Sequence, residues 1–514
     1  MPNPAESVFP QALVDDFTRQ PDLPAFEFQS RPVPRGEVLD LVRRAVANLR
    51  AAGLGRGAGV AVTTAVTPAG FAAQIAAHLL GCRVTGLRPG LTPPQLAAVL
   101  AEDVEAVIAD ATTAGPELAA AAGAARILDA ERDLLAAATL TGDELDPRGR
   151  PDDIALITLT SGSTGRPKGA AQTYRSLTDH WSWQPARRNP VTDRLAAGYR
   201  RYLVFGTLTS AVMLEHLALC LLSGGTAVIP ESPPVFPQVW ERYAITACLC
   251  TVPRLYQVLD TLRGRQGPAP DLSRLRVLLV AGSPLPAHRL AEAADRLGHA
   301  LHQGYGLTET GMLSLLTPHD LAERRGQVLD TVGRPLPGVG IEIRDPRGEP
   351  VPAGGAGEIW VRSAGQASGY WYDDEQTRDV VRDGWFRTRD LGALGADGFL
   401  RLVGRARDVV FVNAILYYAG AIEAALATHP DVDQAYVVAA PDDRTGEAAH
   451  AFVVPVAGRV PDPDALRAAV RAALGEPAVP ATVTVLDAVP VAPGGKPDKQ
   501  ALTALLPGAG GAAT

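Results

Sequence analysis

Leu159-Thr160-Ser161-Gly162-Ser163-Thr164-Gly165-Arg166-Pro167-Lys168-Gly169 is the stretch around which the rest of this chain is organised. Its glycines allow backbone turns that a Cβ would forbid, and successive N–H groups in such turns converge on an anion. Side-chain donors and a nearby cation come from Thr160, Ser161, Ser163, Thr164 and Lys168. The preceding segment, 153–158, predicts a short buried strand. The stretch therefore predicts a loop that holds a polyphosphate at the end of a strand.

This stretch does not match a Walker A loop, which requires G-x-x-x-x-G-K-[ST]. Counted from Gly162, Pro167 stands where the second glycine should be. A flexible Ser/Gly surface linker is the alternative interpretation. It is disfavoured because linkers seldom have an ordered strand on one side and Pro-Lys-Gly on the other.

Length and composition limit the class of protein. A chain of 514 residues is too long for one hydrophobic core, so we expect two or more domains. The net charge is −8 and no run of Lys or Arg occurs, which argues against a nucleic-acid partner. The longest apolar stretch, 211–222, is interrupted by Glu215 and His216 and is too short to cross a membrane. With no signal peptide visible, we expect a cytoplasmic protein without a membrane partner.

The four cysteines are Cys82, Cys220, Cys248 and Cys250. They lie in mostly apolar surroundings and lack the C-x-x-C spacing of a zinc or redox site. We therefore expect buried packing residues in a reducing compartment.

The order of the elements predicts the fold class. Strands alternate with helices on both sides of the loop, which predicts doubly wound α/β sheets. We expect strands at 25–28, 57–62, 104–109, 224–229, 245–250 and 275–282, and helices at 11–17, 35–52, 68–81, within 199–222 and at 233–243. Short alternating segments from about 330 to 404 predict a small β-barrel. From 409 to 514, short strands and an Ala-rich helix at 464–474 predict a smaller α+β lid domain.

Five motifs occur in a fixed order along the chain. They are 160–169, the segment 303–309 (Gln-Gly-Tyr-Gly-Leu-Thr-Glu), 384–390 (Gly-Trp-Phe-Arg-Thr-Arg-Asp), 404–408 (Gly-Arg-Ala-Arg-Asp) and 493–496 (Pro-Gly-Gly-Lys). With these motifs the chain resembles the adenylate-forming superfamily of acyl- and aryl-CoA ligases, peptide-synthetase adenylation domains and luciferases. The resemblance covers nearly the whole chain. It implies an N-terminal domain at 1–404, a hinge at 405–408 and the lid at 409–514.

The resemblance implies a role for each motif. A carboxylate attacks the α-phosphorus of ATP, and both reactants are anions that cations and N–H groups must neutralise. Glu309 would hold Mg²⁺, Asp390 would accept the ribose hydroxyls, and Lys496 would bridge the substrate carboxylate and the α-phosphate. Tyr305 would stack on adenine, and Asp408 would be the point where the lid swings. The catalytic residues implied are Lys496, Glu309, Thr160 and Arg405.

The other residues implied by the resemblance bind nucleotide or acid. The nucleotide-binding set is Thr160, Ser161, Gly162, Ser163, Thr164, Gly165, Lys168, Gly282, Ser283, Pro284, Gln303, Gly304, Tyr305, Gly306, Thr308, Asp390, Arg405 and Lys496. The walls of the acid pocket would be Thr209, Ser210, Val252, Gly282, Gly304 and Met312. Most of these pocket residues are small or apolar, and no Asp occurs at 207–210 to pair with an amino group, which favours an aryl or aliphatic acid over an α-amino acid.

Three positions depart from the family pattern. Small hydroxylated residues at 207–210 stand where ligases often carry an aromatic residue and a His. Ala414 replaces a glycine of the loop that lines the pantetheine tunnel, and Arg389 replaces the usual glycine before Asp390. The adenylation motifs are thus largely intact, whereas the residues for thiol transfer are altered.

These features lead to three hypotheses. The first is ATP-dependent activation of a small carboxylic acid to acyl-AMP, then transfer to coenzyme A or a carrier-protein thiol. The second keeps adenylation and changes the later step to an amide, a β-lactone or nitrite activation, because of Ala414 and the Thr209-Ser210 pair. The third is a non-catalytic nucleotide sensor, which the intact Glu309 and Lys496 disfavour.

Overall fold

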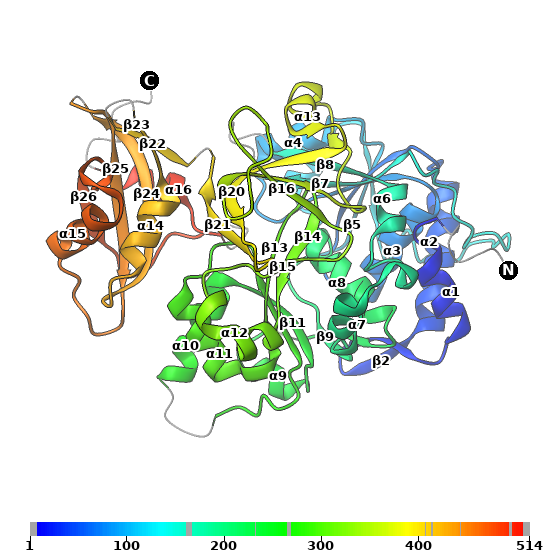
Figure 1. The fold of residues 1–514 in the computed structure, drawn as a ribbon. Coiled ribbons are helices and arrows are strands. Elements are labelled where there is room, and N and C mark those ends of the chain that lie inside the picture. The colour runs from blue at the N-terminus through cyan, green and yellow to red at the C-terminus, as the bar shows by residue number, and fades with distance from the viewer. Residues whose placement is uncertain are drawn as a thin grey trace.

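The computed structural model describes residues 8–160, 167–231, 233–264, 269–406, 408–412, 415–442, 444–492 and 496–506. Among these residues, two large sheets, a smaller sheet and a C-terminal unit are distinguished (Figure 1). The fold is mixed α/β, as expected from the alternation of strands and helices.

The first large sheet carries the phosphate-loop strand. Its order is β18 (Gly369–Tyr370), β8 (Lys168–Thr173), β7 (Ile154–Thr160), β4 (Arg83–Gly86), β3 (Gly59–Thr63), β5 (Ala106–Ala109) and β6 (Arg126–Asp129). The strands from β7 to β6 are parallel, whereas β8 returns antiparallel to β7. Helices α4 (Pro93–Leu100) and α5 (Pro116–Ala121) contribute to a cluster of buried side chains with β3 and β5.

The second large sheet supplies the other edge of the site. Its order is β15 (Arg334–Pro335), β14 (Gly311–Leu316), β13 (Leu301–Leu307), β12 (Val277–Ala281), β11 (Ala247–Thr251), β9 (Arg201–Leu203), β10 (Thr226–Ile229), β1 (Pro24–Phe28) and β2 (Arg31–Pro34). Its helices are α9 (Gln238–Arg242), α10 (Val252–Arg263), α11 (Ala287–Leu297) and α12 (Pro318–Val328), and all four contribute to one apolar core with this sheet.

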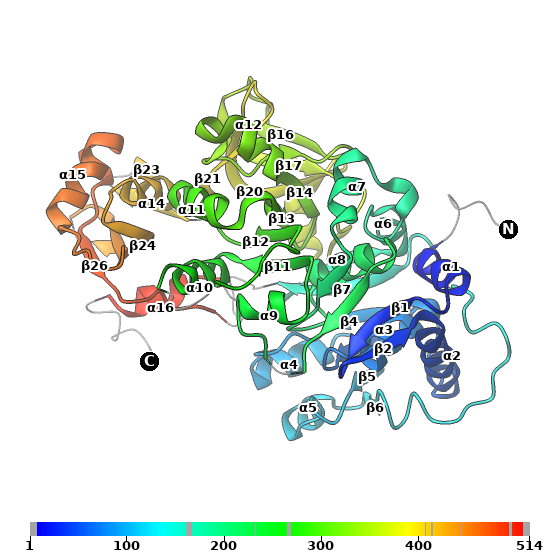
Figure 2. The same cartoon turned by 90° about the horizontal axis from the view of Figure 1, so that it is seen from below.

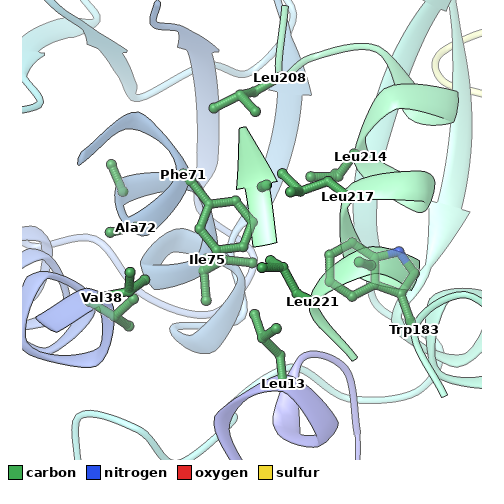
Figure 3. Close-up of a cluster of buried hydrophobic side chains, with 14 of the residues drawn as sticks. Leu13, Val38, Phe71, Ala72, Ile75, Trp183, Leu208, Leu214, Leu217 and Leu221 are labelled. Atoms are coloured by element: carbon green, nitrogen blue, oxygen red, sulfur yellow. The ribbon is translucent and has the colours of Figure 1, made fainter. Parts of the chain in front are cut away.

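The largest apolar core unites both sheets. It is built by α1 (Gln11–Arg19), α2 (Arg35–Ala51), α3 (Pro68–Leu79), α6 (Tyr174–Asp179), α7 (Pro190–Ala197) and α8 (Ala211–Leu221) with strands of each sheet. Leu214, Leu217 and Leu221 of α8 lie close to Phe71 and Ile75 of α3 (Figure 3). Every residue of α3 is buried. Many of its side chains are small, so neighbouring elements can approach this helix closely.

The smaller sheet matches the predicted β-barrel region. It has the order β16 (Gly340–Arg344), β17 (Ala356–Arg362), β20 (Trp385–Leu394) and β19 (Val381–Arg382), with β21 (Leu400–Arg405) also paired to β20. Helix α13 (Asp374–Val380) lies beside β18 and β20. Short 3₁₀ helices occur at Pro185–Arg187, Gly298–Ala300 and Glu476–Ala478.

The C-terminal unit has its own sheet and its own cores. The strand order is β23 (Ile415–Tyr418), β22 (Val409–Val412), β25 (Gly446–Pro455) and β24 (Val432–Asp442), and β26 (Thr482–Val485) pairs with β25. Its helices are α14 (Ala419–Ala427), α15 (Pro463–Leu474) and α16 (Lys499–Ala504). Figure 2 shows this unit beside α10 and α11 of the N-terminal part.

Most expected elements are present, with one clear exception. The helix expected at 233–243 is only α9, Gln238–Arg242, because Pro233, Pro234 and Pro237 lack the backbone donors that a longer helix needs. The cysteines are free and buried, as predicted. No helix among the described residues is long and apolar enough to cross a membrane.

Candidate functional site

The described part of the phosphate-loop segment lies at the facing ends of two strands. Thr160 ends β7 opposite Lys168, which begins the antiparallel strand β8. Ser161, Gly162, Ser163, Thr164 and Gly165 lie outside the described residues. The Lys168 ammonium bonds Gln376 and lies 5.8 Å from the centre of the Tyr370 ring. Burial and the nearby Arg389 lower the pKa of Lys168, whereas Asp373 and Glu309 act in the opposite direction.

Glu309 stands in the turn between β13 and β14, next to Thr308. Its Oε1 accepts a 2.8 Å hydrogen bond from the Tyr370 hydroxyl. Strand β18 carries Tyr370 and pairs with β8, so this tyrosine links Glu309 to Lys168. The sequence analysis did not single out Tyr370, because 61 residues separate it from Glu309. A neighbouring Arg389 adopts the left-handed conformation, φ 61°, at the position where the family usually has glycine.

The carboxylate of Glu309 is suitable for Mg²⁺, since hard cations prefer oxygen ligands. No group of three or more His, Cys, Asp or Glu side chains gathers as a metal cluster within the described residues. A Mg²⁺ ion at Glu309 would therefore take its other ligands from phosphate oxygens and water, as Mg²⁺ at nucleotide sites commonly does.

A second group forms where β20 and β21 pair, with Asp390 opposite Arg405. Asp390 is 7% exposed; its Oδ2 accepts a 2.8 Å hydrogen bond from the Tyr305 hydroxyl, and its Oδ1 lies 3.2 Å from Arg405 Nε. Burial raises the pKa of Asp390, while Arg405 and Tyr305 act in the opposite direction. The sequence analysis assigned Tyr305 to adenine stacking and did not foresee that its hydroxyl holds this carboxylate.

Lys496 comes from the C-terminal unit and reaches the same place. A Cβ added to Gly282, just beyond β12, would lie 3.9 Å from Lys496 Cε. Burial and Arg405 lower the pKa of Lys496, whereas Glu309 and Asp390 raise it. Lys496 is exposed to solvent. Lys496, Gly282, Glu309, Asp390 and Arg405 therefore meet at one edge of the second sheet. Pro493, Gly494 and Gly495 lie outside the described residues.

The remaining nucleotide-binding candidates lie on the same strands. Gln303, Gly304, Tyr305 and Gly306 belong to β13, and Ser283 and Pro284 follow β12. A Cβ on Gly306 would lie 2.2 Å from the Gly311 carbonyl oxygen, so glycine is required for the close β13–β14 approach. Parallel strands β12 and β13 end beside Glu309, the edge where ligands bind in open α/β sheets.

The acid-pocket candidates divide into two groups. A Cβ on Gly304 would lie 3.3 Å from Met312 Sδ, so these two residues lie side by side near Gly282. Thr209 is buried and its hydroxyl bonds Thr207 and the Leu87 carbonyl. Ser210 caps α8, and Val252 is buried in the core around α10. The assignment of Thr209, Ser210 and Val252 to the pocket stays a prediction.

Two polar contacts hold the C-terminal unit in this position. Asp408, the predicted hinge residue, accepts a 2.8 Å contact from Lys499, which also lies 2.9 Å from Glu423. Farther away, Arg289 of α11 forms a bidentate buried ion pair with Asp433 of β24. Local sequence patterns gave no signal for this pair, because 144 residues separate its members. Ala414 lies outside the described residues.

Comparison with known proteins gives consistent matches. The chain matches the AMP-binding enzyme family over residues 13–371 and the AMP-binding enzyme C-terminal domain over residues 421–496. It is 35% identical to feruloyl-CoA synthase from an Amycolatopsis species, over 88% of this chain and 90% of that protein. It is 34% identical to the solved structure of the amide bond synthetase McbA from Marinactinospora thermotolerans, with a TM-score of 0.82 and coverage of 96% and 98%. The o-succinylbenzoate CoA synthetase from Bacillus subtilis shares the fold, with a TM-score of 0.81, 24% identity and coverage of 96% and 98%.

Proposed function

Because this chain belongs to the AMP-binding enzyme family, we propose that Lys496, Glu309 and Asp390 form the centre at which it activates a carboxylic acid with ATP. The acid becomes an acyl adenylate and pyrophosphate is released. The observation that carries this proposal is the position of Lys496 against Gly282, close enough to Glu309 and Asp390 for both carboxylates to raise its pKa.

Each group has a role that follows from its charge. In the proposed reaction the acid carboxylate attacks the α-phosphorus and the bond to pyrophosphate breaks. Lys496 would lie between the two reacting anions and lower their repulsion. Asp390 accepts hydrogen bonds from the ribose, and its orientation is fixed by Tyr305 and Arg405.

The polyphosphate would lie between Glu309 and the facing ends of β7 and β8. Lys168 supplies a cation at the start of β8, and Tyr370 fixes the direction of the Glu309 carboxylate. A Mg²⁺ ion bound by Glu309 would neutralise phosphate charge. No side chain acts as a covalent nucleophile in this scheme; catalysis comes from positioning and electrostatics.

For the second step, the first candidate acceptor is the thiol of coenzyme A or of a carrier protein. The likeness to feruloyl-CoA synthase over most of both chains supports this choice. The second candidate is an amine, which would give an amide. The likeness to the amide bond synthetase McbA over nearly all of both chains favours it, as does Ala414 where the pantetheine loop usually has glycine.

Pyrophosphate exchange into ATP tests the first step with a panel of aryl and aliphatic acids. Lys496→Ala should lower the exchange rate by on the order of 10²–10³-fold, the usual loss for one electrostatic donor at a reacting centre. Arg471→Ala is the control, because Arg471 is an exposed cation of the same C-terminal unit that pairs with Glu476 instead. Unchanged exchange in Lys496→Ala would refute the assignment.

The acceptor is tested by mass spectrometry on the products. The protein, ATP and an accepted acid are incubated with coenzyme A in one sample and with a primary amine in another. Thioester in the first sample supports the ligase reaction. Amide formed only when protein is present, together with acyl-AMP that persists beside coenzyme A, supports the amide reaction.

A further inference from the structure

Helix α8 carries a buried carboxyl group that the proposed adenylation steps do not use. Glu215 is 6% exposed in the middle of that helix. Its one polar neighbour within the described residues is His180 Nε2, 3.7 Å from Oε1, which is longer than a hydrogen bond. Burial raises the pKa of Glu215 to about 8, so the group is mostly a neutral acid at pH 7. Buried polar groups normally have hydrogen-bond partners, so this one needs an explanation.

His180 faces Glu215 and is itself held in place. The backbone N–H of Ser182 donates to His180 Nδ1 at 3.2 Å, and the Ser182 hydroxyl lies 2.7 Å from the same nitrogen. Burial lowers the pKa of His180 to about 4, so the ring is neutral and its proton is on Nε2, towards Glu215. Together the two side chains offer an N–H and a carboxyl group with unused hydrogen-bonding capacity.

This pair lies next to the predicted acid pocket. A Cβ on Gly311 would lie 3.1 Å from His180 Nε2 and 3.6 Å from Glu215 Oε1. The next residue, Met312, touches the position of a Cβ on Gly304, and Gly304 and Gly282 are both predicted to line the acid pocket. Gly311 and Met312 both keep exposed surface. Gly282, Gly304, Met312 and Gly311 thus form a series of neighbouring residues between Lys496 and Glu215.

The surroundings are suitable for a flat ring. A Cβ at position 304 would lie 3.3 Å from Met312 Sδ and one at 311 would lie 3.1 Å from His180 Nε2, so only glycine leaves these atoms uncovered from that side. The Met312 thioether is a favourable neighbour for an aromatic ring. The Trp181 ring stacks on His180 with 5.4 Å between centroids and covers its other side. A neutral acid and a neutral imidazole offer no charge to a cationic ligand, so a neutral hydrogen-bond donor suits them better than an ammonium group.

We propose that Glu215 and His180 form the far wall of the acid pocket and select an aryl acid that carries a neutral donor, a phenolic O–H or a ring N–H, opposite its carboxylate. This inference rests on the proposed adenylation of an acid at Lys496. The donor would bond the Glu215 carboxyl, which has no hydrogen-bond partner within the described residues. Discrimination arises because an acid without the donor leaves this buried group unpaired.

The test uses pairs of acids that differ by one donor. The pairs are 4-hydroxycinnamic with cinnamic acid and indole-3-carboxylic with benzofuran-3-carboxylic acid. The ratio of kcat/KM within each pair is measured by pyrophosphate release, and the ratio of Kd by calorimetry without ATP. The variants are Glu215→Met, which removes hydrogen bonding at similar size, and Glu215→Gln, which keeps it. Gln74→Met is the control, because Gln74 is another buried side chain with an unpaired oxygen in the described structure.

We expect the wild-type protein to favour the donor acid of at least one pair by on the order of 10–100-fold in both ratios. Glu215→Met should remove that preference, Glu215→Gln should keep part of it, and Gln74→Met should keep all of it. Glu215→Met should also unfold at a temperature no lower than the wild type, since it replaces an unpaired buried polar group.

Three results would overturn the inference. The first is an equal donor preference, in kcat/KM and in Kd, for wild type and Glu215→Met. The second is a lower unfolding temperature of Glu215→Met with no change in that preference. The third is that no donor acid binds or reacts. Failure of the proposed function looks different: donor acids would bind with the expected preference in calorimetry, yet no acid would release pyrophosphate.

Discussion

Asp433→Asn should weaken the docking of the C-terminal unit on α11 and thereby slow adenylation. In the structure Asp433 accepts hydrogen bonds from Arg289 and lies 3.3 Å from His288 Nε2. The side chains of Asp433 and Arg289 are 8% and 4% exposed, so solvent screens this pair little. The substitution keeps the shape of the side chain and removes the charge that Arg289 needs.

The pKa of Asp433 supports an estimate of the effect. Burial would raise this pKa, but hydrogen bonds from His288 and Arg289 lower it from 3.8 to about 2. A decrease of this size corresponds to about 2 kcal/mol of stabilisation for the ionised form, or roughly 30-fold in an equilibrium. Removing one partner of a buried pair can cost about 3–5 kcal/mol when the other partner stays buried. Here Arg289 returns to water when the C-terminal unit undocks, so we expect the effect to be closer to the about 2 kcal/mol derived from the pKa. Because the folded pKa is depressed, this stabilisation is present above about pH 4 and is lost as pH falls towards 2.

Two measurements report on docking. Limited proteolysis between residues 405 and 408 should be faster in Asp433→Asn, and small-angle scattering should show a larger average radius. Pyrophosphate exchange should fall, because Lys496 reaches Gly282 only from this orientation in the structure. Asp487→Asn is the control, since Asp487 is exposed in the same unit. Wild-type exchange together with wild-type proteolysis in Asp433→Asn would refute the reasoning.

Two further predictions concern single buried groups. Tyr305→Phe removes the hydroxyl that donates to Asp390. The KM for ATP should rise about 10-fold, because a buried acceptor that loses its donor costs ~1–3 kcal/mol. An unchanged KM for ATP in pyrophosphate exchange would contradict this. His78 is fully buried, neither ring nitrogen has a partner within the described structure, and burial lowers its pKa to about 3. Since the unfolded chain binds a proton at His78 below about pH 6.5 and the folded chain does not, the free energy of unfolding should fall by up to about 1.4 kcal/mol per pH unit on acidification. Urea unfolding at pH 5 and pH 7 should show a smaller difference for His78→Leu than for wild type, and an equal difference would disprove the contribution.

Local patterns were sufficient for several features of this protein. The apolar run at 275–282 appears as β12, and the segment at 153–158 appears as β7. The motif at 303–309 contains a glycine that the local structure requires, since Gly306 is needed for the close contact with β14. The helix predicted at 233–243 is shorter in the structure, where Pro233, Pro234 and Pro237 precede α9.

Contacts between distant segments had no local signal. Tyr370 orients Glu309 only because β18 pairs with β8, and Arg289 meets Asp433 only because the C-terminal unit docks on α11. The proposed role of Glu215 also had no local signal. In the sequence this residue only interrupts an apolar stretch. It becomes a candidate recognition group because it packs against His180 and Gly311.

The amino-acid sequence alone determined the fold class, the order of the motifs and the residue types that handle phosphate, because backbone freedom and hydrophobic period are properties of short segments. The tertiary structure decided which charges face one another and which are removed from water. Those quantities depend on distance and burial, which arise only when segments far apart in the chain pack together.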